Sequence, residues 1–350
     1  MVETIKKINE TLINAILKKA ETICPDALEL LGVYGSCATG DVHEKSDLDL
    51  LILIRDESGR KLAEVFLLDD VGIGYDIYCT TWEMLEEDAQ CNHAHLSKLM
   101  DSTVVYVKNS EVTDRLEALK KQAADTLHSE ERYEKAQALL DEARKLYADC
   151  FLEDDLSLVR AKAGGVIHFL LDGVMLHHGR YFKKGVKRTF EELDDLNLPM
   201  DLKKPVLAVI QAEDVQIIRE NLTSLIKAVQ VILHRNVQLE VPTAENLSGT
   251  YEEMFSNWRN KMQEAAQKND LFSSYMNMAS LQFMLWEISG EVAVQNQNIM
   301  GEFSPLDLKK NGDLFDHALT TYLEEYKKAG MEPKRFQDVH DFVAYYQNRE

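Results

Sequence analysis

The first third of the chain places apolar residues in short blocks between polar segments, which predicts a small domain mixing strands and helices. Residues 4–21 carry apolar side chains at helical spacing and predict an amphipathic helix. Residues 60–68 and 81–90 are expected to form two further short helices, the second capped by Thr81. Short apolar runs predict strands within residues 27–36, 48–54, 72–80 and 102–107.

Beyond residue 112 the pattern becomes helical, and no further strand is predicted. Residues 134–151 and 206–233 repeat apolar side chains at helical spacing. Residues 158–176 are apolar nearly all round, as expected for the central helix of a bundle. Residues 241–250, VPTAENLSGT, have the composition of a linker.

The sequence therefore predicts an α+β protein. Its first domain, with a mixed β-sheet and helices, is expected at residues 1–112. A helical bundle domain is expected at residues 113–242, and a C-terminal helical extension at residues 243–350.

The net charge of the chain excludes some classes of function. The chain has 39 Lys and Arg against 60 Asp and Glu, a net charge of −21, which argues against a protein that grips duplex nucleic acid. An acidic chain still binds phosphate groups through metal ions or through one local basic cluster. No apolar run is long enough to span a membrane, and the start of the chain lacks the apolar core of a signal peptide. The five cysteines are scattered, so we expect reduced thiols and a cytoplasmic location.

The candidate chemistry lies in GVYGSCATGDVHEKSDLDLLILI. Gly35 and Ser36 follow a predicted strand, where exposed backbone N–H groups and a hydroxyl form a small anion-binding turn. Asp47 and Asp49 are two apart at the start of the next strand, so their carboxylates face the same way. Such a pair suits two Mg²⁺ ions about 3.5–4 Å apart. Asp76 would add a third carboxylate if its strand lies beside the second one.

This combination of a phosphate-binding turn and aspartates on neighbouring strands is the apparatus of two-metal phosphoryl or nucleotidyl transfer. G-S-x10-D-x-D with a later strand aspartate resembles the nucleotidyltransferase superfamily that contains DNA polymerase β, over about residues 27–107. The resemblance implies that Gly35 and Ser36 hold the β- and γ-phosphates of a nucleotide. It also implies that Asp47, Asp49 and Asp76 are the catalytic, metal-binding carboxylates.

Two alternatives to a catalytic site remain open. The glycine, serine and aspartates are also common turn residues at strand ends, and Asp76 would suit a solvent-facing strand position. A site of this pattern can also bind a nucleotide without turning it over.

One basic cluster stands out against the acidic background, HHGRYFKKGVKR at residues 177–188. The cluster resembles an aromatic-then-lysine turn in the helical domains of small-molecule nucleotidyltransferases. By that resemblance Lys187, with Lys184 and Arg188, would contact the triphosphate. The alternative is a solvated turn that offsets the acidic residues 191–196. The histidine pairs at 93 and 95 and at 177 and 178 lack matching ligand spacing, so no zinc site is predicted from them.

The sequence as a whole predicts a Mg²⁺-dependent nucleotidyltransferase. The enzyme would transfer a nucleoside monophosphate, from ATP or another NTP, to a hydroxyl of a small molecule and release pyrophosphate. Family resemblance suggests an antibiotic such as an aminoglycoside or a lincosamide as the acceptor. The alternatives are transfer to a protein or RNA, as in toxin–antitoxin systems, and a non-catalytic nucleotide-binding regulatory module. Neither duplex nucleic acid nor a membrane is an expected partner, and the sequence leaves the oligomeric state open.

Overall fold

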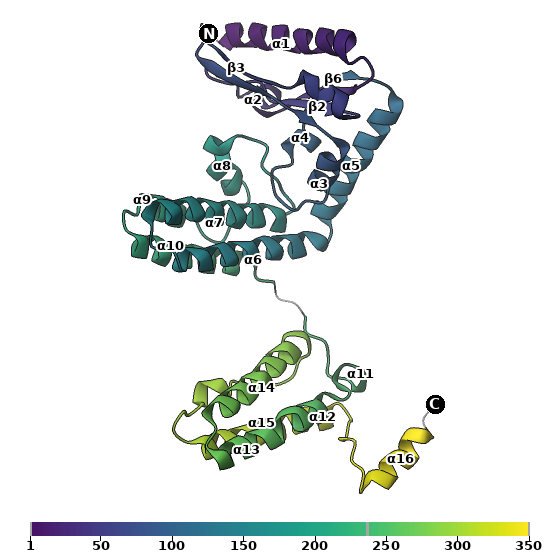
Figure 1. Ribbon diagram of the computed structural model, residues 1–350, viewed down its shortest axis with the longest axis vertical. Helices are drawn as coiled ribbons and strands as arrows, with labels where there is room; N and C mark the ends of the chain where they lie inside the picture. Colours follow the sequence, from purple (N-terminus) through teal and green to yellow (C-terminus); the bar gives the residue numbers. More distant parts are fainter. Residues whose placement is uncertain (1, 236–237, 349–350) are drawn as a thin grey trace. The chain divides into compact units, whose positions relative to one another are not determined.

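The computed structural model describes residues 2–235 and 238–348 (Figure 1). The chain divides into two compact units, residues 1–235 and 236–350. In the described residues, no helix is both long enough and apolar enough to cross a membrane.

The N-terminal part of the first unit alternates helices and strands, as the sequence predicted. In chain order it contains α1 (Val2–Ile23), β1 (Leu28–Val33), α2 (Gly35–Thr39), β2 (Leu50–Ile54), the 3-10 helix η1 (Glu57–Leu62), β3 (Glu64–Leu68), β4 (Ile73–Ile77), β5 (Cys79–Thr80), α3 (Trp82–Ala89), α4 (Ser97–Met100) and β6 (Thr103–Val107). Thr81 caps α3 by accepting a hydrogen bond from the N–H of Met84.

Four of these strands form one mixed sheet in the order β5-β2-β1-β6. Strand β1 is antiparallel to β2 and β6, whereas β2 and β5 are parallel. Strand β2 is buried along its whole length because both faces of the sheet are covered. Leu51 and Leu53 face a core shared with the later helices, and Ile52 on the other face packs in the core that contains α1.

The short helix predicted at residues 60–68 is only half correct. Residues Glu57–Leu62 form the 3-10 helix η1, but Glu64–Leu68 form β3, which pairs with β4 as a separate two-stranded sheet. Phe66 of β3 stacks on Tyr75 of β4 with ring centroids 5.4 Å apart. This cross-strand pairing outweighs the local helical pattern.

The rest of the first unit is helical: α5 (Ser110–His128), α6 (Glu131–Phe151), α7 (Leu156–His177), the 3-10 helix η2 (Val186–Arg188), α8 (Thr189–Asp194), α9 (Lys203–Gln211) and α10 (Val215–Leu233). Helix α7 packs against α6 and α10, in the central position that its apolar sequence predicted. The continuous apolar pattern at residues 206–233 is interrupted, because Asp214 caps the start of α10.

The second unit is also helical. It contains α11 (Ala244–Leu247), α12 (Thr250–Met254), the π-helix η3 (Phe255–Arg259), α13 (Asn260–Lys268), α14 (Leu271–Glu291), the 3-10 helix η4 (Met300–Glu302), α15 (Leu308–Lys328) and α16 (Val339–Gln347). Its own core centres on residues such as Met278, Phe315 and Tyr322. In the described part of the chain after β6, the one extended pairing is an isolated bridge between Glu240 and Val292. The predicted α+β class, a mixed-sheet domain followed by a largely helical region, is confirmed.

Candidate active site

The candidate site is built around a close contact between Gly35 and Asp49. Strand β1 ends at Val33, and the short helix α2 starts at Gly35 with a φ of 62°. A Cβ atom added to Gly35 would lie 1.9 Å from Oδ2 of Asp49. Glycine is therefore required twice here, for the left-handed backbone and for the approach of the Asp49 carboxylate.

Ser36 follows directly on the first turn of α2. Its Oγ atom is buried, and no hydrogen-bond partner for it exists among the described residues. Nearby, the N–H of Tyr34 donates to the carbonyl of Asp49 at 3.1 Å, which ties the Ser36 turn to the start of β2. A buried hydroxyl without a partner is free to donate to a bound ligand.

Asp47 and Asp49 lie just before β2, not inside it. Their positions still alternate with the buried Leu48 and Leu50, so both carboxylates lie on the same side of the chain. Burial, and then the negative charge of Asp47, raise the pKa of Asp49, partly offset by a hydrogen bond from the backbone of Ser36. The two carboxylates thus repel each other, as oxygen ligands arranged for a cation do.

Asp76 lies beside Asp47 but outside the main cavity. Its strand β4 pairs with β3, while the strand next to β2 is β5. Asp76 is exposed on β4 and lines a smaller hollow of about 310 Å³ together with Asp47 and side chains of β3. Asp47 therefore borders both hollows.

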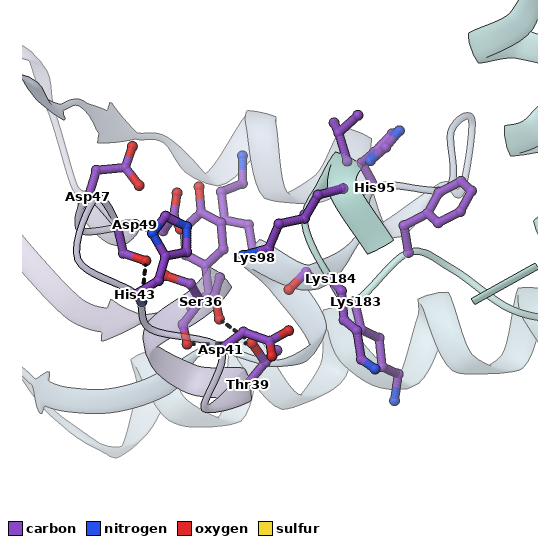
Figure 2. Close-up of a pocket in the computed structure, with 18 of the residues that line it drawn as sticks. Ser36, Thr39, Asp41, His43, Asp47, Asp49, His95, Lys98, Lys183 and Lys184 are labelled. Carbon is purple, nitrogen blue, oxygen red and sulfur yellow. Dashed lines mark hydrogen bonds between the residues drawn. The ribbon is translucent and has the colours of Figure 1, made fainter. Parts of the chain in front are cut away.

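A cavity of about 530 Å³ brings most of the predicted residues together. It is lined by Gly35, Ser36, Asp47, Asp49, Lys184 and Lys187, among others. In Figure 2, Asp47, Asp49 and Ser36 lie on one side of the cavity, and Lys183 and Lys184 approach from another. The volume lies within the range of about 300–1,000 Å³ that is usual for small-molecule sites.

The lysines reach this cavity because the segment after α7 is fastened at several points. Helix α7 ends at His177, and Gly179 turns the chain with a φ of 64°. The N–H of Phe182 then donates to the carbonyl of Ala94 at 2.8 Å. The hydroxyl of Tyr181 donates to Asp101 at 2.8 Å. The basic cluster is therefore anchored to the sheet-containing part of the unit.

Glu192 holds the loop that carries Lys183 and Lys184. Its buried carboxylate accepts the backbone N–H groups of Lys183 at 2.9 Å and Lys184 at 3.1 Å. Replacing Glu192 by glutamine leaves one of these donors unpaired, so we expect KM for the nucleotide that the sequence predicts to rise about 10-fold and stability to fall by about 1–3 kcal/mol. Nucleotide titrations and thermal unfolding check this result. The exposed Asp195, replaced by asparagine, is the control, and an equal rise in KM for both variants would contradict it.

Arg188 is placed differently from the two predicted lysines. Its Nη1 pairs with Asp41 at 2.9 Å, and its Nε pairs with Glu191. Arg188 thus bridges the loop after α2 and the start of α8, and it does not line the cavity. These two ion pairs indicate that Arg188 links the two segments.

Several residues of the cavity were not singled out from the sequence. They are Asp41, His43, Tyr78, Lys98 and Lys183. Asp41 and His43 lie within the motif segment, and Lys183 lies within the basic cluster, so proximity to those motifs is the signal for them. Tyr78 is held by a 2.8 Å hydrogen bond between its hydroxyl and that of Tyr34. Burial and this bond raise the pKa of Tyr34.

Lys98 had no recognisable signal, and His95 was noted only as one of a histidine pair with His93, from which no zinc site was predicted. Lys98 on α4 pairs with Asp88 at 3.2 Å. The carboxylate of Asp172 on α7 raises the pKa of His95. The contact between His95 and Asp172 joins segments that lie far apart in the sequence.

The comparison with protein families agrees with this geometry. Residues 13–149 match the family described as the nucleotidyltransferase domain. No curated protein matches the chain. A solved structure of a nucleotidyltransferase-like protein from Exiguobacterium sibiricum 255-15 is 16% identical, with a TM-score of 0.35, and the match covers 81% of this chain and 92% of that chain. The family match spans the Ser36 turn, all three aspartates and the helices α3, α4 and α5. The N-terminal part of this chain is therefore a nucleotidyltransferase domain of the DNA polymerase β type.

Proposed function

We propose that the protein is a Mg²⁺-dependent nucleotidyltransferase that transfers a nucleoside monophosphate, from ATP or another NTP, to a hydroxyl of a small molecule. The observation that carries this proposal is the meeting of Ser36, the Asp47 and Asp49 pair and the lysines of residues 183–187 in one cavity. Carboxylates on one side and ammonium groups on the other suit a triphosphate that arrives with divalent cations.

The residues present fit magnesium. Asp47 and Asp49 offer only oxygen ligands, their carboxylates repel each other, and the pair borders an open cavity. These two side chains would hold two Mg²⁺ ions, with Asp76 as the third carboxylate. Bound magnesium supplies charge neutralisation at the phosphates and lowers the pKa of a coordinated hydroxyl.

The chain's own groups have separate tasks in this proposal. The Ser36 hydroxyl donates to an oxygen of the β- or γ-phosphate, in place of the partner it lacks. Lys184 and Lys187 neutralise the triphosphate and then the departing pyrophosphate. Asp76, next to Asp47, accepts the proton of the attacking hydroxyl. Arg188 holds the loop of Asp41 in place for these contacts.

The charge of the chain indicates only the chemical class of the acceptor. The chain has a net charge of −21, so a cationic acceptor such as an aminoglycoside would be attracted to it. A lincosamide is the second acceptor to test. Both offer hydroxyl groups of the kind that the reaction needs.

The experiment is incubation with α-labelled ATP, Mg²⁺ and a panel of aminoglycosides and lincosamides. We expect the label to move to one acceptor class, with release of one pyrophosphate for each transfer. The same reaction with GTP, CTP and UTP identifies the preferred nucleotide. Label on an added protein or RNA would replace the small-molecule acceptor. Mg²⁺-dependent ATP binding that survives Asp76→Asn, without turnover on any acceptor, would instead indicate a regulatory binding module.

A further inference from the structure

A second group of metal-ligating side chains lies at the wall of the main cavity. His95 lines the cavity and lies across it from Asp47 in Figure 2. Behind it, His168 and Asp172 lie on α7. One ligand atom from each of these three side chains lies within 4.8 Å of the others. The proposed nucleotidyl transfer gives none of the three a role.

The two residues on α7 are four apart. This spacing places both side chains on one face of a helix, one turn from each other, as in helical metal sites built from i and i+4 ligands. His95 comes from the loop between α3 and α4, and the N–H of Ala94 in that loop donates to Oδ2 of Asp172 at 3.1 Å. The third ligand is thus held against the helix by an independent hydrogen bond.

The distances between ligand atoms are close to those around a small cation. Nε2 of His95 lies 3.2 Å from Oδ1 of Asp172, and Nε2 of His168 lies 3.7 Å from Oδ2. Zinc–nitrogen and zinc–oxygen bonds of about 2.0–2.2 Å in a tetrahedron separate neighbouring ligand atoms by about 3.3–3.6 Å. The observed separations lie on either side of this range.

The buried carboxylate of Asp172 lacks a full set of hydrogen-bond donors. Its side chain is 1% exposed, and no hydrogen bond within the described residues reaches its Oδ1. The contact of Oδ1 with Nε2 of His95, at 3.2 Å, is an ion pair when the imidazole is protonated, and a cation bound between the two atoms would replace that proton. A buried carboxylate requires a cation or a full set of donors. The His95 and His168 side chains are 47% and 53% exposed, which leaves an entry path and room for a water ligand.

From these observations we propose that His95, His168 and Asp172 form a binding site for a divalent transition metal, with zinc as the best match, that keeps one coordination position open to solvent. Two imidazoles and one carboxylate favour zinc, whereas the all-oxygen set of Asp47 and Asp49 favours magnesium. A bound ion would fasten the loop of His95, and with it one wall of the cavity, to α7. The site stands independently of the proposed transfer reaction.

The test is direct metal binding by the full chain in excess Mg²⁺, which saturates the magnesium carboxylates. Zn²⁺ is titrated against a chromophoric chelator, and Co²⁺ is followed by its visible absorption. We expect one Zn²⁺ for each chain, a higher unfolding temperature with zinc, and a Co²⁺ spectrum without the intense near-ultraviolet band of a thiolate ligand. His168→Ala and Asp172→Asn should each weaken zinc binding at least about 10-fold.

Two matched variants locate the ion. His93→Ala removes a nearby imidazole that contacts Asp88 and accepts the backbone N–H of His95, so it should weaken zinc binding much less than His168→Ala does. Asp47→Asn should leave the zinc affinity unchanged. Because His168 is half exposed, His168→Ala is expected to fold, and its metal-free unfolding temperature checks this. No binding at micromolar zinc, an unchanged affinity in folded His168→Ala, an equal loss in His93→Ala, or a thiolate band with Co²⁺ would each overturn the proposal.

Discussion

Asp49→Asn is expected to reduce nucleotidyl transfer at least about 10³-fold, equivalent to about 4 kcal/mol of lost transition-state stabilisation. The substitution keeps the shape of the side chain but removes one of the two carboxylates that we propose to bind magnesium. Rates of pyrophosphate release at saturating Mg²⁺ and NTP measure the effect. A rate within 10-fold of the unmodified protein would contradict the assignment of Asp49 to the magnesium site.

The same variant separates catalysis from stability. The pKa of Asp49 is raised in the folded protein by burial and by the charge of Asp47, so its ionised form destabilises the fold at neutral pH. Removing that charge should leave the free energy of unfolding equal or slightly higher. The exposed Asp69, in the turn between β3 and β4, gives a matched control as Asp69→Asn, with unchanged activity expected.

Gly35→Ala is expected to lower the transfer rate about 100-fold and to destabilise the protein by about 1–3 kcal/mol. The added Cβ would lie 1.9 Å from Oδ2 and 2.6 Å from Cγ of Asp49, so the carboxylate must move out of place. The φ of 62° adds strain for any residue with a Cβ atom. Steady-state kinetics and chemical denaturation measure the two effects.

Gly40 offers a control with the same backbone strain but no contact. Its φ is 77°, and a Cβ atom there would meet nothing within 4 Å. Gly40→Ala should therefore cost about 1 kcal/mol of stability and leave the transfer rate within a few-fold. If the two variants lose activity equally, the contact between Gly35 and Asp49 has no special role in the site.

The N-terminal fold could be predicted from sequence because its signals are local. Strand β2 reads as a buried strand since nearly every residue in it is apolar, and α3 reads as a helix because Thr81 caps an acidic first turn. The β3 strand was missed because its pairing with β4 depends on a contact across a turn. The end of α9 at Gln211 was missed because apolar residues at helical spacing occur both in α9 and in α10, which begins at Val215.

The candidate site also has one part that local sequence signals predict and another that depends on tertiary contacts. Gly35, Ser36, Asp47 and Asp49 lie within 15 consecutive residues, so strand periodicity and turn chemistry place them together without any tertiary information. Lys184 and Lys187 were recognisable as a basic cluster in an acidic chain. That they line the same cavity as the aspartates is decided by the Glu192, Ala94 and Asp101 contacts of their segment.

By itself, then, the sequence determined the class of the first domain and singled out its candidate carboxylates, because both depend on residues close together in the chain. Tertiary structure alone decided that Asp76 shares a hollow with Asp47, that Arg188 pairs with Asp41, and that Lys98 joins the cavity. It also brought His95 to within reach of His168 and Asp172, more than 70 positions away. Such meetings follow from how helices and loops pack across the unit, and no periodicity along the chain records them.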